Sequence, residues 1–191
     1  MLSVIIPTLN SERVLALTLS VLIPGAISGL VREVTVADGG STDKTLEIAD
    51  GAGCAVLVSE APLGRRLRGA AAAARSTWLM FLRPGTVLEP SWLDEATRFI
   101  NEAELVRDGC AAAVFRKSVS AQARQPVIRE ALGLLKFGLL RRVDPDQGLL
   151  IGVAFYKEIG GHREAAADPE ADLLARVGRR RILMLRTGAR K

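Results

Sequence analysis

The stretch Glu33–Thr45 reads EVTVADGGSTDKT, a pattern typical of a strand that ends in a turn before a helix. Its first part, Glu33–Ala37, is rich in β-branched residues, which favours a strand. The Asp, Gly and Ser residues of Asp38–Asp43 predict a turn that caps the following helix, expected at Thr45–Ala49. Strand, turn and helix in this order are the first indication of an α/β protein.

The same order repeats on both sides of this stretch. Short apolar segments predict further strands at Ser3–Ile6, Ala55–Ser59 and Trp78–Leu82. Helices are expected from Asn10 or Ser11 through Leu22, ended by Pro24-Gly25, and at Arg65–Arg75. Trp78–Leu82 is apolar at every position, as in a central parallel strand that is covered on both faces. The first hundred residues therefore predict a largely parallel sheet flanked by helices.

The second half of the chain is less regular. We expect strands at Ala111–Phe115, Gly148–Phe155 and Ile182–Leu185, an amphipathic helix at Val127–Val143 and a capped helix at Asp168–Val177. The 191 residues contain no internal repeat and no linker long enough to separate two domains. We therefore expect one domain over residues 1–191.

The composition limits the classes of partner. Residues 1–104 carry 9 Lys/Arg and 12 Asp/Glu, whereas residues 105–191 carry 17 and 9, so the second half is strongly basic. This charge indicates either an anionic partner or a solvated Arg-rich surface. Aromatic residues for base stacking make up only 4%, and no nucleic-acid-binding motif is present, so we expect no nucleic acid partner. Cys54 and Cys110 are isolated, as is typical of reduced thiols in a cytoplasmic protein.

Polar residues follow three of the predicted strands directly. Pro7-Thr8-Leu9-Asn10 follows the first, Asp38-Gly39-Gly40-Ser41 the second and Arg83-Pro84-Gly85 the fourth. Open α/β sheets bind ligands beyond the carboxyl ends of their strands, so these segments are expected to share a cleft. There Asp38 can accept hydrogen bonds from a base or a ribose, and Gly39 allows a close approach. The alternative is that Asp38 only caps a helix.

These segments together resemble the family-2 glycosyltransferases. The resemblance rests on SVIIPTLNSE at residues 3–12 with EVTVADGGSTDKT, and on residues 62–86, where many members read GRxxQxNxGAxxAxGxxLLFLHAD. Residues 153–179, VAFYKEIGGHREAAADPEADLLARVGR, are similar to the acceptor-side segment. The resemblance implies a GT-A fold: a mixed, mostly parallel, Rossmann-like sheet with a nucleotide-binding half at 1–104 and an acceptor-side half at 105–191.

The resemblance also implies site residues. The nucleotide-binding residues would be Pro7, Thr8, Asn10, Asp38, Gly39, Arg65 and Arg83. Glu170 falls where an Asp serves as general base in the family, with Asp168 and Asp172 as alternatives, and Asp146-Gln147 matches a GDQ-like stretch.

Residues 83–85 depart from the family pattern. At this point an acidic motif of the DxD type normally holds a divalent cation, but Arg83-Pro84-Gly85 contains no carboxylate. A hard cation needs oxygen ligands, so we expect no Mg²⁺ or Mn²⁺ site here. Either Arg83 binds the diphosphate in place of the cation, or the domain has lost catalysis.

Two functions therefore remain open. The first is inverting transfer of a sugar from a UDP- or GDP-linked donor to an acceptor hydroxyl, with Glu170 or Asp168 as base. The second is a catalytically inactive domain that binds sugar nucleotides or acts as a scaffold. A nucleotidyltransferase is not expected, because PTLNSE lacks the Gly-rich basic loop that such enzymes carry after their first strand.

The Val127–Val143 helix bears on the acceptor and on localisation. It predicts a helix that packs on the core or lies on an anionic membrane surface, because Lys136, Arg141 and Arg142 flank its apolar face. Many relatives act on lipid-linked acceptors, so the resemblance implies a lipid-linked or other anionic acceptor for this chain. We also expect a cytoplasmic protein that can bind peripherally to a membrane. His162, the only histidine, has no nucleophile partner at a telling spacing and is expected in a turn or at the surface.

Overall fold

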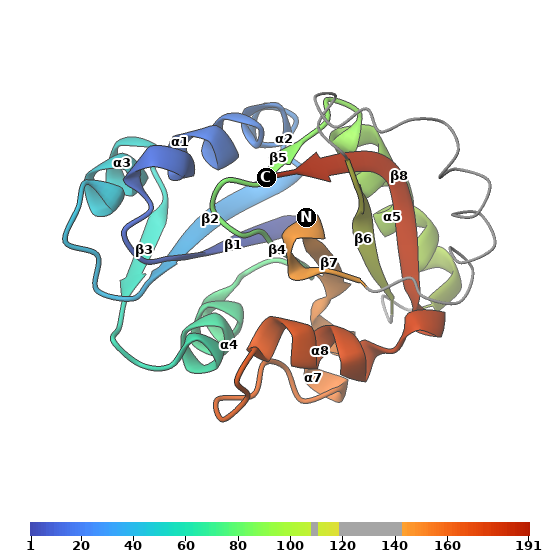
Figure 1. Cartoon of the computed structure of the whole chain (residues 1–191). Coiled ribbons are helices and arrows are strands. Elements are labelled where there is room, and N and C mark those ends of the chain that lie inside the picture. Colours follow the sequence, from blue (N-terminus) through green and yellow to red (C-terminus); the bar gives the residue numbers. More distant parts are fainter. Residues whose placement is uncertain (108–110, 119–142) are drawn as a thin grey trace, which may run out of the picture.

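The computed structural model describes residues 1–107, 111–118 and 143–191. Within them, one eight-stranded sheet has the order β3-β2-β1-β4-β7-β6-β8-β5 (Figure 1). The strands are β1 (Leu2–Thr8), β2 (Val31–Asp38), β3 (Ala55–Val58), β4 (Trp78–Phe81), β5 (Val87–Leu88), β6 (Ala112–Lys117), β7 (Leu149–Gly152) and β8 (Ile182–Arg190). The helices are α1 (Glu12–Ser20), α2 (Ile23–Ile27), α3 (Thr45–Gly51), α4 (Leu63–Ala73), α5 (Trp92–Arg107), α7 (Val153–Glu158) and α8 (Pro169–Val177), with 3₁₀ helices η1 (Pro145–Gln147) and η2 (Arg179–Arg181).

The four strands predicted in the first hundred residues form a parallel block of the sheet. β1 pairs in parallel with β2 and with β4, and β2 pairs in parallel with β3. Every residue of β1 and of β4 is buried, which is the pattern expected of strands with helices on both faces. In this arrangement the carboxyl ends of β1, β2 and β4 meet at one edge of the sheet, so the α/β prediction is confirmed.

The second half of the chain makes the sheet mixed. β7 pairs antiparallel with both β4 and β6, whereas β8 is parallel to β6 and antiparallel to the short β5. The predicted strand Gly148–Phe155 is too long: β7 ends at Gly152, and Val153 begins α7. An apolar run of this length is compatible with a strand or a buried helix, and here it contains one of each.

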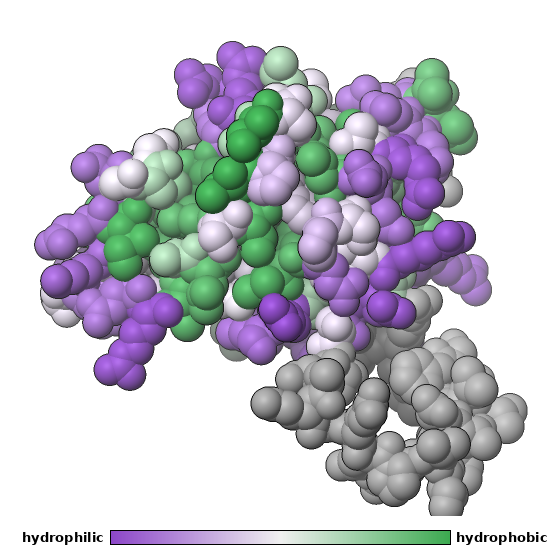
Figure 2. Space-filling view, turned by 90° about the horizontal axis from the view of Figure 1, so that it is seen from above, coloured by the Kyte–Doolittle hydropathy of each residue, from purple (hydrophilic) through white to green (hydrophobic). Residues whose placement is uncertain are grey.

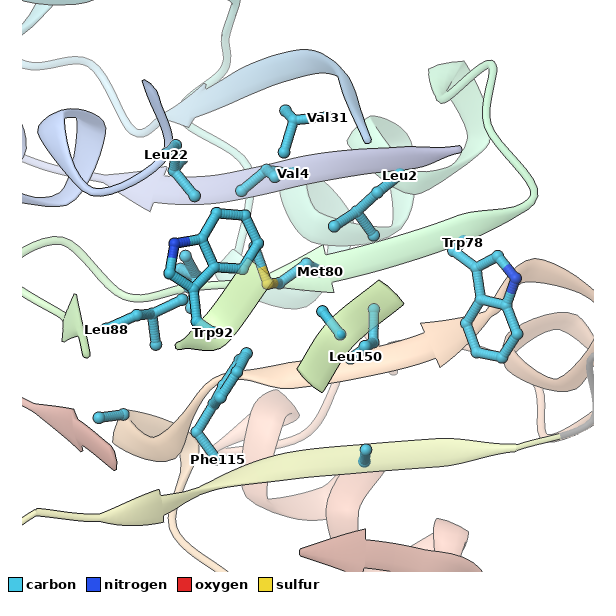
Figure 3. Packing of buried hydrophobic residues seen from close by; sticks show 14 of the residues in the cluster. Leu2, Val4, Leu22, Val31, Trp78, Met80, Leu88, Trp92, Phe115 and Leu150 are labelled. Atoms are coloured by element: carbon cyan, nitrogen blue, oxygen red, sulfur yellow. The ribbon is translucent and has the colours of Figure 1, made fainter. Parts of the chain in front are cut away.

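Helices pack two separate cores on the two faces of the sheet (Figure 1). Val4 and Ile6 of β1 point to the face covered by α1, α3 and α5, while Ile5 between them points to the face covered by α4, α7 and α8. This alternation is the two-residue period of a strand. Figure 3 shows the first core, in which Trp92 of α5 lies near Leu22, Met80 and Leu88.

The segment Pro24-Gly25 corrects a prediction. Instead of ending one long helix, it lies within α2, after α1 has already ended at Ser20. Proline is tolerated in the first turn of a helix, where its missing N–H would have no intrahelical partner. Gly25 is needed because a Cβ there would lie 2.6 Å from the Trp92 ring. The predicted helix Val127–Val143 falls almost entirely outside the described residues.

The outer side of α1 and α2 is partly apolar. Figure 2 shows hydrophobic side chains on this face of the molecule, and Leu17, Ile23 and Ile27 are among the exposed ones. Leu15, by contrast, is fully buried and faces the sheet. These helices therefore contact the core with one side and present apolar side chains on the other. None of the described helices is long and apolar enough to cross a bilayer.

Candidate functional site

The carboxyl ends of β1 and β2 are joined through Asp38. Thr8 and Asp38 are partners in the β1–β2 register, and the Thr8 hydroxyl donates to Asp38 Oδ2 at 2.7 Å. The backbone N–H groups of Gly40 and Ser41 donate to Oδ1 at 2.8 and 2.7 Å, and the Ser41 hydroxyl donates to Oδ2. Burial alone would raise the pKa of the Asp38 carboxyl, but these hydrogen bonds lower it below its ordinary value. The fully buried carboxylate therefore organises the loop that follows β2.

Asn10 and Gly39 belong to the same network. Asn10 has a positive φ of 49°, its backbone N–H donates to the Ser41 hydroxyl, and its Oδ1 accepts from the backbone N–H of Thr42 at 2.9 Å. The Gly39 N–H donates to the Thr8 carbonyl at 2.9 Å. The structure thus brings these predicted residues together, in a loop whose polar groups bond largely to one another.

A cavity of about 300 Å³ lies beside this loop, at the carboxyl edge of the parallel strands. Its walls come from the ends of β1, β4 and β8 and from the first turns of α4 and α8. The lining residues are Pro7, Thr8, Leu9, Leu63, Arg66, Arg83, Pro84, Glu170 and Lys191. Four of them were predicted site residues from distant parts of the sequence: Pro7, Thr8, Arg83 and Glu170.

Arg83 is held in place by carboxylates. Its Nε donates to Glu170 Oε2 at 2.7 Å and its Nη1 donates to Asp146 Oδ1 at 3.3 Å. Its Nη2 lies 3.8 Å from Asp168 Oδ1. Burial would lower the pKa of Arg83, but Glu170 and Asp146 raise it above its ordinary value. A guanidinium has five N–H donors, and these two hydrogen bonds use two of them. Arg83 is therefore a fixed cation with donors left for an anion.

The two predicted bases differ in their surroundings. The Glu170 side chain is only 8% exposed, and burial raises the pKa of its carboxyl although Arg83 acts in the opposite direction. Asp168 is half-exposed and caps α8, because its Oδ1 accepts from the N–H of Ala171 at 3.0 Å. Of the two, Glu170 is the carboxylate that lines the cavity.

Asp146 contacts Arg83 because hydrogen bonds hold the segment around Asp146 in place. The Asp144 carboxylate accepts from the Asp146 N–H, and the Gln147 side chain both accepts from the Asp144 N–H and donates to the Phe115 carbonyl at 2.7 Å. These bonds form a capping box around η1. The GDQ-like stretch predicted from the sequence therefore lies next to the cavity.

The loop before α8 packs directly on α4. A Cβ at Gly64 would lie 2.2 Å from the Arg163 carbonyl oxygen, so only glycine permits this contact. The contact fixes the segment that leads to Asp168 and Glu170.

Sequence reasoning chose Arg65 on α4, but the neighbouring Arg66 lines the cavity. Arg65 is exposed and pairs with Glu164 at 3.6 Å. Arg66 Nη1 donates to the carbonyl oxygens of Thr8 and Ala37 at 3.0 and 2.8 Å. Leu67 is buried, so an apolar residue directly after Arg66 could have indicated which side of α4 faces the sheet. Lys191 was also missed, and no sequence pattern pointed to it.

His162 is buried, which corrects the expectation of a surface histidine. It is 1% exposed, its Nδ1 lies 2.9 Å from the Tyr156 hydroxyl, and its ring contacts Phe81 edge-on. Burial lowers the pKa of His162 to about 3, so the imidazole is neutral at physiological pH. It therefore acts as a core residue beneath the parallel strands.

Solved structures of one enzyme have the same fold as this chain. Glucosyl-3-phosphoglycerate synthase from Mycobacterium tuberculosis, in complex with Mn²⁺, UDP and glucosyl-3-phosphoglycerate, is 20% identical with a TM-score of 0.68, over 98% of this chain and 70% of that chain. Its complex with Mn²⁺ and UDP-glucose is 22% identical with a TM-score of 0.67, over 98% and 69%. Both show that this chain has a GT-A fold.

A comparison at the sequence level gives the family itself. No curated protein matches the chain significantly. The model of glycosyl transferase family 2, however, matches residues 3–155, which is most of the chain and includes the ends of β1, β2 and β4. The chain therefore belongs to glycosyl transferase family 2.

Proposed function

We propose that this chain transfers a sugar from a UDP- or GDP-linked donor to an acceptor hydroxyl without a divalent cation, and that Arg83 binds the donor diphosphate. The observation that carries the proposal is the position of Arg83 at the cavity, anchored by Glu170 and Asp146 with donors to spare. A guanidinium binds phosphate oxygens well, because its planar donors match their geometry. The similar synthase that was solved with UDP and with UDP-glucose supports a uridine donor.

The lack of metal-ligating groups at residues 83–85 supports the proposal that no divalent cation is needed. The turn offers no carboxylate, and the three nearest carboxylates, Asp146, Asp168 and Glu170, already surround the Arg83 guanidinium. Among the described residues, no group of three or more His, Cys, Asp or Glu side chains is placed to hold a metal ion. A divalent cation next to Arg83 would be repelled, so these residues do not fit one.

Glu170 is the base in this proposal, and Asp168 is the alternative. The carboxylate removes the proton of the acceptor hydroxyl as that oxygen attacks the anomeric carbon, and the bond from that carbon to the diphosphate oxygen breaks. The charge that develops on the leaving diphosphate is stabilised by Arg83. A raised pKa favours Glu170 as a base, because the proton is then taken up more readily.

The remaining proposals concern the protein as a whole. We infer that residues 1–191 form one domain, with the donor bound by 1–104 and the acceptor by 105–191. Asn10, Asp38 and Gly39 contribute to nucleoside binding through the loop that the buried Asp38 holds in place, while Arg65 contributes at most from the rim. A lipid-linked or other anionic acceptor and an anionic membrane surface also stay predictions, because the helix Val127–Val143 that indicates them falls almost entirely outside the described residues. A cytoplasmic, peripheral location stays a prediction as well.

The binding test is calorimetric titration of UDP and GDP in EDTA and in Mn²⁺. We expect the wild type to bind with the same affinity in both buffers. Arg83→Lys should bind about tenfold more weakly, because lysine keeps the charge but lacks the planar N–H donors of the guanidinium. Arg98→Lys is the matched control, because Arg98 also faces two carboxylates but lies on α5, away from the cavity. A tenfold loss of affinity in EDTA would show that a metal binds, contrary to the proposal.

The catalytic test distinguishes sugar transfer from the second candidate function, a catalytically inactive domain that binds sugar nucleotides. The missing acidic motif favours that second function. With UDP-glucose and a panel of acceptors, we expect release of UDP that falls at least about a hundredfold in Glu170→Gln, with donor affinity changed much less. Asp168→Asn should be nearly as active as the wild type. Tight donor binding with no turnover of any donor and acceptor would instead establish a non-catalytic sugar-nucleotide-binding domain.

A further inference from the structure

The last strand brings a second cation to the turn at residues 83–85. The end of β8 pairs with β5, with Arg190 opposite Val87, and Figure 1 marks the C end beside β5. Lys191 then lies across the turn: a Cβ added at Gly85 would be 3.7 Å from Lys191 Cγ. Lys191 also lines the cavity beside Arg83 and Pro84. Lys191, although far away in the sequence, thus lies next to the turn at residues 83–85, which is the position of the acidic motif in the family pattern.

Asp146 links this lysine to Arg83. Its Oδ1 accepts from Arg83 Nη1 at 3.3 Å and from Lys191 Nζ at 3.2 Å. Because both nitrogens bond to one oxygen, they cannot be farther apart than the sum of these distances, a span that oxygens on the two phosphates of one diphosphate can bridge. Asp146 itself is not among the residues that line the cavity.

The charges of the wall suit a diphosphate. The lining residues include three cations, Arg66, Arg83 and Lys191, and one carboxylate, Glu170. Arg66 Nη1 donates to two backbone carbonyls, whereas the Lys191 ammonium has three N–H donors and uses one on Asp146. Lys191 is therefore the cation that can follow an incoming phosphate most easily, because its side chain is half-exposed and flexible.

We propose that Lys191 is a second diphosphate-binding residue, paired with Arg83 and positioned by Asp146. The inference rests on the proposed function, since it assigns the two cations that stand at the turn in place of a metal ion. The ligand class is a nucleoside diphosphate or its sugar ester, bound through oxygens of both phosphates. The nucleoside contributes nothing to the Lys191 contact.

The test compares UDP with uridine, and GDP with guanosine, on the wild type and on Lys191→Met, which keeps most of the apolar side chain but removes the ammonium. We expect Lys191→Met to lower the affinity for the diphosphate about tenfold and to leave nucleoside binding, followed by ligand-observed NMR, unchanged. The dependence of diphosphate affinity on salt should also become shallower. Lys191→Arg should restore most of the loss.

Arg181→Met is the matched control, because Arg181 forms a similar exposed pair with Glu158 at 3.9 Å but does not line this cavity. It should bind UDP and GDP like the wild type. If the wild type binds a diphosphate and Lys191→Met binds it equally well, this inference is wrong while the proposed function stands. An equal loss for nucleoside and diphosphate would also overturn it, and a wild type that binds neither UDP nor GDP would refute both proposals.

Discussion

The loop after β2 and the cluster around Arg83 are both polar and lie at the same edge of the sheet, yet they are built in opposite ways. In the loop, Asp38 accepts its hydrogen bonds from Thr8, Gly40 and Ser41, three of the four from within three residues of itself. In the cluster, Arg83 bonds to Asp146 and Glu170, 63 and 87 residues away. The difference teaches that a local motif can preform a loop, whereas a cluster of charged side chains from distant segments depends on the whole fold.

The largest expected effect comes from breaking the cluster. Arg83→Met leaves the buried Glu170 carboxylate without its cation, so we expect a loss of about 3 kcal/mol in the free energy of unfolding at pH 7. The double variant Arg83→Met/Glu170→Gln should recover much of this loss, because no buried charge is then unpaired. Urea unfolding measures all three proteins. Additive losses in the double variant would mean that the pair is not coupled.

A smaller effect should appear in the pH dependence of stability, with opposite signs in the two regions. The lowered pKa of Asp38 means that its contribution is present above the ordinary Asp value of 3.8 and is lost as the pH falls through the folded-state pKa. The raised pKa of Glu170 means that its contribution is present below the ordinary Glu value of 4.5 and is lost as the pH rises through the folded-state pKa.

Denaturation midpoints measured between pH 3 and pH 8 test this contrast. The stability difference between wild type and Asp38→Asn should shrink on acidification, whereas the difference between wild type and Glu170→Gln should shrink as the pH rises. Slopes of the same sign for the two variants would contradict the opposite pKa shifts.

The smallest effect is expected at Gly39, where the loop after β2 lies against the Arg66 side chain. A Cβ there would lie 3.0 Å from Arg66 Nη1, the end of a flexible side chain, so Gly39→Ala should cost only about 0.5 kcal/mol. The control is Gly64→Ala, where the Cβ would lie 2.2 Å from a backbone oxygen and the cost should reach about 2 kcal/mol. Thermal unfolding of the two variants checks the order, and a larger loss at Gly39 would mean that Arg66 cannot move.

The sequence by itself determined the parallel half of the fold, the family and the residues that end β1, β2 and β4. Those predictions succeeded because they rest on local rules: apolar runs for buried strands, turn residues after them, and the fact that parallel strands end at one edge. The same rules failed for Pro24-Gly25 and for Val153–Phe155, where a proline in a first helical turn and an apolar run each allow two structures.

Only the tertiary structure decided which side chains share the cavity. Arg65 and Arg66 are both arginines on α4, and the packing of that helix on the sheet puts Arg66 in the cavity and Arg65 in solvent. Lys191 comes to the turn after β4 because β8 adds to the far side of the sheet and runs alongside β5. Such contacts depend on strand pairings between residues that are more than a hundred positions apart in β5 and β8, and local sequence patterns carry no information about those pairings.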